Sequence, residues 1–174
     1  MHALAENGVL MSSLARSVFY LLVSSVITMS AAADDNSAGS RIAYSTAACQ
    51  PIIPAESAFL VYNPSGVFVS GDTQNVTVHC PIARTKTNSR RGARVDVVVF
   101  KRGTFDLAVH CALYSLSSDG SAVVDSDEQP ASLGHAASAV IELRVENIER
   151  DGFFTLACLL PRDHGMAQYV VQER

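Results

Sequence analysis

The sequence contains no Trp, little charge and few cysteines, and each of these shortages excludes a class of protein. Charged residues make up 17% of the 174 residues and hydrophobic residues 48%, which excludes an intrinsically disordered chain. Four Cys are too few for a small disulfide-dense scaffold. The net charge of −4 gives no overall signal for nucleic-acid binding. The absence of Trp weighs against sugar binding, because sugar platforms commonly rely on stacking by Trp or Tyr.

The sequence also lacks an apolar run long enough to span a membrane. Its longest run, 18–29, has 12 residues, whereas a membrane-spanning helix needs about 20. Arg16 precedes the run, and Ala31 and Ala33 follow it at the spacing of a signal-peptidase site. This pattern predicts a signal peptide over 1–33, cleaved after Ala33, and a periplasmic or secreted mature protein. A buried core helix is the alternative.

The predicted signal peptide has two possible start residues, Met1 and Met11. The first ten residues include Glu6 and neither Lys nor Arg, whereas a start at Met11 produces a more typical signal. The sequence leaves open whether translation begins at Met1 or Met11. Residues 34–48 are polar and small, which predicts a flexible leader, and no transmembrane segment is predicted after removal of the signal.

All four cysteines lie in the predicted mature chain. An even number of cysteines in an exported chain indicates two disulfides. None of them forms a C-x-x-C pair, which argues against a zinc knuckle and against a redox-active dithiol. Three connectivities are open, with four buried free thiols as the alternative. We expect the sequential pairing, which joins Cys49 to Cys80 and Cys111 to Cys158.

The mature sequence shows short runs of β-favouring residues separated by turn residues. Apolar and polar residues alternate in 75–80, 105–113 and 137–146. Helix formers make a helix the alternative for 137–146, but its polar alternation favours a strand. The nearly continuous apolar run 153–160 predicts a central strand. These runs predict an all-β antiparallel β-sandwich over 49–174, of jelly-roll or immunoglobulin-like type.

Turn residues divide the remaining strands. Pro64 and Gly66 predict a turn, with Gly66 free to adopt a positive φ, and Pro81 predicts either the end of a strand or an edge position. Further short strands are predicted at 59–62, 66–70, 94–100, 122–124 and 169–172.

Four pieces of the sequence share a layout with a known group of proteins. The pieces are Cys80-Pro81-Ile82, Cys111-Ala112-Leu113, FFTLACLLP at 153–161, and Tyr169-Val170-Val171-Gln172-Glu173. With them the chain resembles small exported bacterial proteins of unknown function that have a CPI … C … C-x-LP … Y-x-V-x-E layout. The resemblance covers about 45–174. It implies an exported all-β protein and lends no activity.

Basic residues are concentrated in one part of the sequence. The window 84–102 has a charge of +6, with Asp96 as its single acidic residue, which leaves −10 for the rest of the mature chain. We expect 83–94 to be a long polar loop that could contact an anionic surface or a glycan, with a solvated loop as the alternative. The candidate residues for this patch are Arg84, Lys86, Arg90, Arg91 and Arg94.

The sequence lacks the motifs of an enzyme or a metal centre. It contains neither G-x-S-x-G nor an H-x-x-x-H pair. Asp106 and His110 could share a strand face, but no nucleophile completes a triad with them. Four acidic residues offer oxygen ligands for Ca²⁺ without the spacing of an EF-hand, so a solvated turn is the default interpretation. They are Asp119, Asp125, Asp127 and Glu128.

The sequence therefore predicts no catalytic, cofactor-binding or metal-ligating residue. It favours an exported, disulfide-stabilised β-sandwich that is not an enzyme and acts as a structural or interaction module. A glycan- or anionic-ligand-binding module is the first alternative, and a small secreted hydrolase is the second. A flat exposed pair of tyrosines would favour sugar binding. The tyrosines of the mature chain are Tyr44, Tyr62, Tyr114 and Tyr169.

Overall fold

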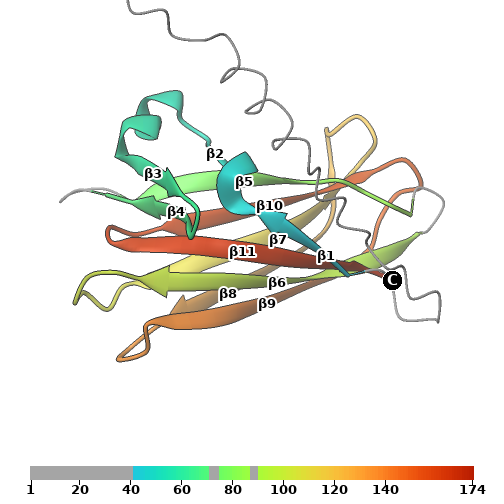
Figure 1. The fold of residues 1–174 in the computed structure, drawn as a ribbon. Coiled ribbons are helices and arrows are strands. Elements are labelled where there is room, and N and C mark those ends of the chain that lie inside the picture. The colour runs from blue at the N-terminus through green and yellow to red at the C-terminus, as the bar shows by residue number, and fades with distance from the viewer. Residues whose placement is uncertain (1–40, 71–74, 87–89) are drawn as a thin grey trace, which may run out of the picture. The chain divides into compact units, whose positions relative to one another are not determined.

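Two antiparallel β-sheets pack face to face in the computed structural model of the chain (Figure 1). The structure describes residues 41–70, 75–86 and 90–174. The predicted signal peptide, its cleavage site and the choice between Met1 and Met11 all lie outside these residues. Within the described part of the chain, no helix is both long and apolar enough to cross a membrane.

The described strands divide into a six-stranded sheet A and a five-stranded sheet B. Sheet A has the order β3-β4-β11-β6-β9, and β1 also pairs with β11. Its strands are β1 (Arg41–Ser45), β3 (Leu60–Asn63), β4 (Gly66–Val69), β6 (Arg91–Lys101), β9 (Ser138–Asn147) and β11 (His164–Glu173). Sheet B has the order β2-β5-β10-β7-β8. Its strands are β2 (Gln50–Pro51), β5 (Val76–Ile82), β7 (Ala108–Leu116), β8 (Val123–Ser132) and β10 (Phe153–Leu160). Two short 3₁₀ helices precede β2 and β3, η1 (Thr46–Ala48) and η2 (Pro54–Phe59).

The strand pairing identifies the sandwich as a jelly roll. From β4 to β11 the chain has eight strands, and the first pairs with the last, the second with the seventh, the third with the sixth and the fourth with the fifth. Consecutive strands from β4 to β7 therefore alternate between the two sheets. This nested pairing is that of a jelly roll and differs from the immunoglobulin-like order, so the first of the two predicted types is present.

Inward-facing side chains of both sheets form one apolar core. The alternation predicted for 75–80 and 137–146 is confirmed, because Val76, Val78 and Cys80 are buried in the first run, and Ile141, Leu143 and Val145 are buried in the second. The run 153–160 is the predicted central strand, since β10 lies between β5 and β7. The largest fully buried apolar side chains are Leu113, Leu143, Leu156, Leu160, Met166 and Tyr169.

The predicted turn between β3 and β4 is present. The carboxamide oxygen of Asn63 accepts a hydrogen bond from the Ser65 N–H at 2.8 Å, and Gly66 has a φ of +137°. A side chain at Gly66 would also collide with the backbone of Met166. Pro81 is an edge residue of the predicted kind: it lies inside β5, which β2 covers only at Val78 and His79.

Two predicted boundaries were wrong. The sandwich begins before residue 49, because β1 pairs with β11 and η1 follows it, so 41–48 do not form a flexible leader. The strand predicted from Phe105 begins only at Ala108, where pairing with β8 starts. Phe105 is instead 46% exposed, and the Arg162 guanidinium lies over its ring at 3.5 Å. Its apolar surface is covered by a cation and not by the core.

Strand β8 is the largest departure from the sequence prediction. Only 122–124 was expected as a strand, and the acidic residues that follow were interpreted as a turn, yet β8 continues to Ser132. Every residue of β8 is at least partly exposed, so it lacks the apolar alternation that predicts a strand. Its hydrogen bonds to β7 hold it in the sheet at the edge.

Candidate functional site

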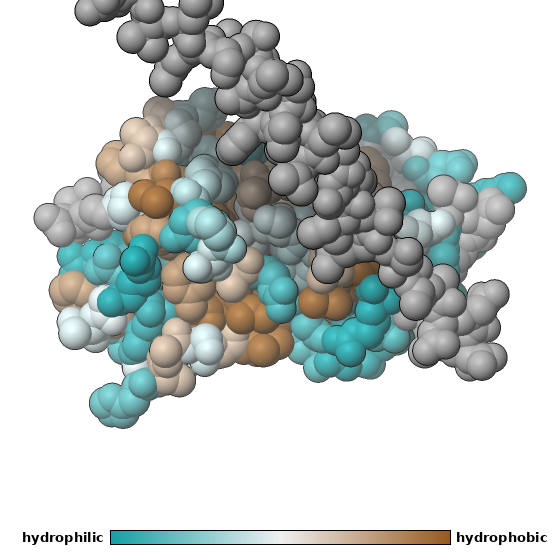
Figure 2. Space-filling model, in the orientation of Figure 1, coloured by the Kyte–Doolittle hydropathy of each residue, from teal (hydrophilic) through white to brown (hydrophobic). Residues whose placement is uncertain are grey.

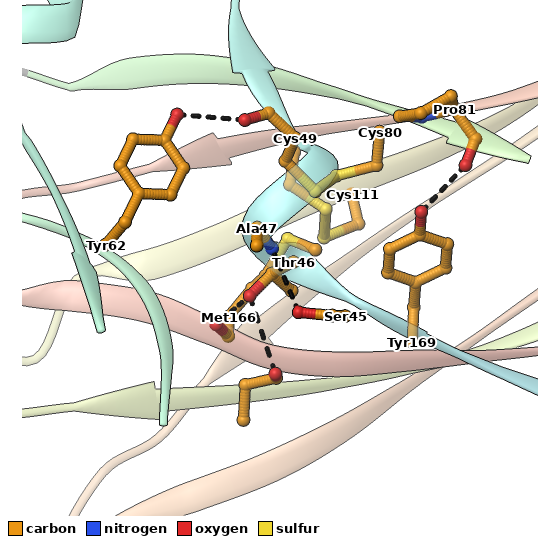
Figure 3. The surroundings of a disulfide bond; sticks show 12 residues. Ser45, Thr46, Ala47, Cys49, Tyr62, Cys80, Pro81, Cys111, Met166 and Tyr169 are labelled. Carbon is orange, nitrogen blue, oxygen red and sulfur yellow. Dashed lines mark hydrogen bonds between the residues drawn. A yellow bond between two sulfur atoms is a disulfide. The ribbon is translucent and has the colours of Figure 1, made fainter. Parts of the chain in front are cut away.

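The cysteines form the two sequential disulfides, and all four are buried. Cys49, at the end of η1, is joined to Cys80 on β5 (Figure 3). Cys111 on β7 is joined to Cys158 on β10, its direct partner in the strand register. The bridges are therefore structural, as the predicted inward positions of these residues indicate.

The first two residues of the predicted basic patch hold a loop to the sandwich. The Nη1 atom of Arg84 donates to three carbonyl oxygens between β9 and β10, at 2.7 to 3.1 Å. The buried carboxylate of Glu173 accepts the backbone N–H of Thr85 at 2.6 Å and of Lys86 at 2.8 Å. These bonds use the Arg84 side chain and the Lys86 backbone to join the end of β5 to two other parts of the fold.

The other three residues of the predicted basic patch, Arg90, Arg91 and Arg94, do not form one loop surface. The segment 83–94 is not a loop throughout, because β6 begins at Arg91 and carries Arg94. Arg90 lines a hollow of about 420 Å³ at the end of the sandwich, beside Arg150 and the acidic residues Glu149 and Asp151. The cations of this hollow therefore have anions beside them.

Arg94 belongs to a ladder of ion pairs on the outer face of sheet A. Its guanidinium contacts Asp96 at 2.9 Å and Glu142 at 2.9 Å, and Arg41 reaches Asp96 at 3.2 Å. The hydrogen bond to Asp96 raises the pKa of Arg94. Figure 2, which views this side, shows hydrophilic residues at both ends of the molecule, one of them the end where β6 begins. The polar groups of this ladder bind one another.

The four acidic residues considered for Ca²⁺ serve separate parts of the fold. Asp119 shapes the turn between β7 and β8, where hydrogen bonds from the Ser117 hydroxyl and from Ser121 lower its pKa to about 2. The carboxylates of Asp125 and Asp127 accept backbone N–H groups of β9, from Arg144, Glu146 and Asn147. Among the described residues, no group of three or more His, Cys, Asp or Glu is placed to hold a metal ion.

These bonds from β8 close one side of the sandwich. β9 is an edge strand of sheet A and β8 an edge strand of sheet B, so the Asp side chains replace a missing strand partner. Partial burial opposes ionisation of Asp125, but the N–H donors of Glu146, Asn147 and Ser126 outweigh it and lower its pKa. The acidic segment is thus a structural seam between the sheets.

The outer face of sheet B carries a different feature, a shallow hollow across four strands. Its floor is the pair Ala112 on β7 and Ala157 on β10, which are direct partners in the register. Side chains two residues further along each strand point to the same face and are larger. Two alanines side by side therefore leave a depression of about 230 Å³, which we call the trough. It is lined by Thr77, His110, Cys111, Ala112, Tyr114, Glu128, Ala157 and Leu159.

The walls of the trough combine rings with hydrogen-bonding groups. His110 and Tyr114 lie on β7 on either side of Ala112, so about 13 Å of strand separates them. His110 pairs in register with Leu159 of β10, which in turn pairs with Thr77 of β5. One long side of the trough thus offers the imidazole of His110 and the hydroxyl of Thr77. The other offers the phenol ring of Tyr114 with its hydroxyl.

Glu128 stands at the β8 end of the trough. It is the register partner of Ala112, and its Oε1 lies 3.9 Å from Nδ1 of His110. At the other end, the exposed His79 of β5 is the register partner of Ala157. From β5 to β8 the trough extends about 14 Å.

The charge of sheet B differs from that of sheet A. Within the described residues, the five strands of sheet B contain no Lys or Arg, and all of their carboxyl side chains lie on β8. Asp125 and Asp127 bind β9, which leaves Glu128 facing the trough. A negatively charged ligand would meet repulsion there, whereas an uncharged ligand would not.

The tyrosines do not form a flat exposed pair. The rings of Tyr44 and Tyr169 stack at 5.1 Å between centroids, but Tyr169 is fully buried and its hydroxyl donates to the Pro81 carbonyl at 2.7 Å (Figure 3). Burial raises the pKa of Tyr169 to about 12. Tyr62 donates to the Cys49 carbonyl at 2.8 Å. Of the described tyrosines, Tyr114 alone lines the trough.

Sequence reasoning missed the trough and also misplaced one pairing. Asp106 does not reach His110, because it precedes β7 and its carboxylate accepts the Gly134 N–H at 2.8 Å. The trough arises from residues of four strands, and their alignment depends on a register that the sequence does not contain. The small polar-face residues Ala112 and Ala157 were the available signal.

Comparison with known proteins finds similar folds. A xylan-binding module, CBM15, has a TM-score of 0.49 and 15% identity over 78% of this chain and 97% of that module. A module titled BiXyn10A CBM1 has a TM-score of 0.47 and 13% identity, over 79% of this chain and 99% of that one. The C-terminal CBM6 of LamC, from Zobellia galactanivorans, has a TM-score of 0.44 and 8% identity, over 76% and 99%. No family model and no curated protein matches the chain. At these scores the likeness carries no argument about what this chain binds.

Proposed function

We propose that this chain is a non-enzymatic glycan-binding module that holds an uncharged oligosaccharide in the trough of sheet B. The observation that carries the proposal is the alanine floor between Tyr114 and His110, with Thr77 and Glu128 beside it. Sugars present C–H groups on their ring faces and hydroxyls on their edges, so they require an apolar ring and polar groups together. The trough supplies both on an open face.

Charge favours an uncharged glycan over the anionic ligand considered from the sequence. Glu128 is the carboxylate that lines the trough, and the strands of sheet B carry no Lys or Arg within the described residues. Of the basic patch, Arg84 and Arg94 already bind groups of the protein itself. An acidic glycan therefore finds no converging cations on this face.

The composition of the trough also favours binding over hydrolysis. Most glycosidases use two carboxyl groups on opposite sides of the scissile bond. Among the residues that line the trough, the carboxylate is Glu128 alone. A bound oligosaccharide would therefore be held and not cleaved.

A calorimetric titration with a matched pair of variants tests the proposal. The ligands are cellohexaose, xylohexaose, mannohexaose and laminarihexaose, with hexagalacturonate as the acidic counterpart. We expect at least one neutral ligand to bind and Ala112→Leu, which fills the floor, to weaken it at least about tenfold, a cost of about 1.4 kcal/mol. Ala43→Leu makes the same change on an exposed position of sheet A and should leave affinity unchanged.

Two results would contradict the proposal. One is the absence of binding to every neutral ligand by the folded protein. The other is an affinity that survives Ala112→Leu, since the ligand would then occupy another surface.

Export is part of the same proposal, and the two disulfides support it because such bonds persist in oxidising compartments. Mass spectrometry of the protein from a periplasmic or extracellular fraction should show a mature N-terminus at Asp34. A protein that keeps residues 1–33 in the cytoplasm would contradict this part of the proposal.

A further inference from the structure

One of the two disulfides lies directly beneath the trough. Cys111 and Cys158 are register partners on β7 and β10, and the next partners along the same strands are the floor residues Ala112 and Ala157. On the other side, the next partners are the wall residues His110 and Leu159. The bond thus joins the two strands at the step between the floor and one wall.

The floor is also where side chains hold these strands together least. Cross-strand side-chain pairs stabilise a sheet, and an alanine pair contributes the least of them. Ala112 and Ala157 therefore create the hollow and remove side-chain contact between β7 and β10 on the outer face. On the inner face, the adjacent pair is covalently joined and buried, with Cys111 1% and Cys158 0% exposed.

We infer that the Cys111–Cys158 bond is a positioning element of the ligand site. It keeps β7 and β10 at one spacing and in one register where the outer face offers only the small Ala112–Ala157 pair. The ligand-binding groups on these strands, His110 and Tyr114, then keep their places relative to Leu159. This inference rests on the proposed binding of a glycan in the trough.

The second disulfide provides the comparison. Cys49–Cys80 joins β5 to the end of η1, and η1 contributes nothing to the lining of the trough (Figure 3). Both bridges are buried and both close loops of tens of residues, with sequence separations of 31 and 47. Removal of either should lower stability, but only one of them links two strands of the trough floor.

The first experiment separates affinity from stability. Cys111→Ala with Cys158→Ala is compared with Cys49→Ala with Cys80→Ala, each titrated with the tightest-binding neutral hexasaccharide at a temperature where circular dichroism shows a folded protein. We expect about a tenfold loss of affinity in the first pair and less than a twofold change in the second. Equal affinity losses in the two pairs, or none in the first, would overturn the inference.

The second experiment uses the unaltered protein, so it does not depend on the folding of a variant. If the bond favours ligand binding, then by thermodynamic reciprocity bound ligand favours the bond. Dithiothreitol, the reductant, converts each disulfide to two thiols, and alkylation with mass spectrometry counts them with and without the hexasaccharide. Saturating ligand should raise the dithiothreitol concentration that reduces half of the Cys111–Cys158 bond by about tenfold. It should raise the corresponding concentration for Cys49–Cys80 by much less.

The outcomes distinguish the two proposals. A wild-type protein that binds no neutral hexasaccharide removes the proposed function. The wild-type protein could instead bind a hexasaccharide that shifts the reduction of both disulfides equally, or of neither. That result would contradict the positioning role and leave the proposed function standing.

Discussion

The two outer faces of the sandwich show opposite uses of polar residues. On sheet A, Arg94 binds Asp96 and Glu142, and Arg174 binds Glu146 at 3.1 Å, so the charged groups satisfy one another. On sheet B, small residues open a trough, beside which Nδ1 of His110 lies 3.9 Å from Oε1 of Glu128. One face is saturated by its own side chains, whereas the other leaves hydrogen-bonding groups and a ring available. This difference makes sheet B the candidate binding face.

The largest expected effect is a loss of unfolding free energy when the disulfide of sheet B is removed. Cys111→Ala removes a buried cross-strand bridge, and the loss of such a loop constraint costs about 3–4 kcal/mol of unfolding free energy. Thermal melting under oxidising conditions measures it. An unchanged melting temperature would show that the disulfide does not stabilise sheet B. The two sheets would then not differ in their need for a covalent cross-link.

Truncation of the ring on the trough wall should affect binding more than stability. Tyr114→Ala is expected to weaken binding of the neutral hexasaccharide about tenfold, or about 1.4 kcal/mol, because the apolar ring face is lost. Tyr114→Phe keeps the ring and should retain most of the affinity. If the two variants lose affinity equally, the hydroxyl and not the ring contacts the ligand. Equal binding by Tyr114→Ala and wild type would place the ligand elsewhere.

The seam between the two sheets should depend on pH. Asp125→Ala removes the acceptor of the Glu146 and Asn147 N–H groups and should cost about 1 kcal/mol at pH 7. Because the pKa of Asp125 is lowered in the folded protein, its contribution is present above the unfolded value of about 3.9 and is lost as the pH falls through the folded value.

Urea unfolding of wild type and Asp125→Ala at pH 7 and at pH 2.5 measures this contribution. The difference in unfolding free energy between the two proteins should be largest at pH 7 and smaller at pH 2.5. Glu128→Ala, on the same strand but facing the trough, is the control and should leave stability nearly unchanged. A difference that persists undiminished at low pH would mean that the carboxylate charge is not what holds β9.

The smallest effect is expected on the outer face of sheet A. Arg94→Gln breaks exposed ion pairs, each of which contributes about 0.2–1 kcal/mol. Its affinity for the hexasaccharide should equal that of wild type. A loss of binding in Arg94→Gln would move the site to sheet A and reverse the comparison between the faces.

Much of the secondary structure was predictable because burial leaves a trace in the sequence. The alternation around Val76 and Leu143 indicates strands with one face in the core, and both lie in such strands. β8 left no such trace, because its partly buried residues include Asp125 and Asp127, which bind β9 in place of apolar packing. Polar residues on an edge strand have the composition of a turn, so the sequence pattern led to the wrong assignment.

The candidate site was less predictable than the strands that carry it. Arg84 and Arg94 were conspicuous as a cluster of charge, yet each binds a group of the protein that is distant in sequence, at Arg150 and at Glu142. The trough, in contrast, depends on two inconspicuous alanines. The sequence shows which side chains can form ion pairs or hydrogen bonds. The folded structure determines whether groups of the protein itself already occupy them.

The alternation of apolar and polar residues and the even number of cysteines determined the class of this protein from the sequence alone: an all-β chain with two disulfides. The tertiary structure decided the nested pairing of the jelly roll, the partners of each Arg and the meeting of Ala112 with Ala157. The physical reason is that alternation has a period of two residues and reports only which face is buried. Which strands lie side by side, and in which register, depends on contacts between residues far apart in the chain.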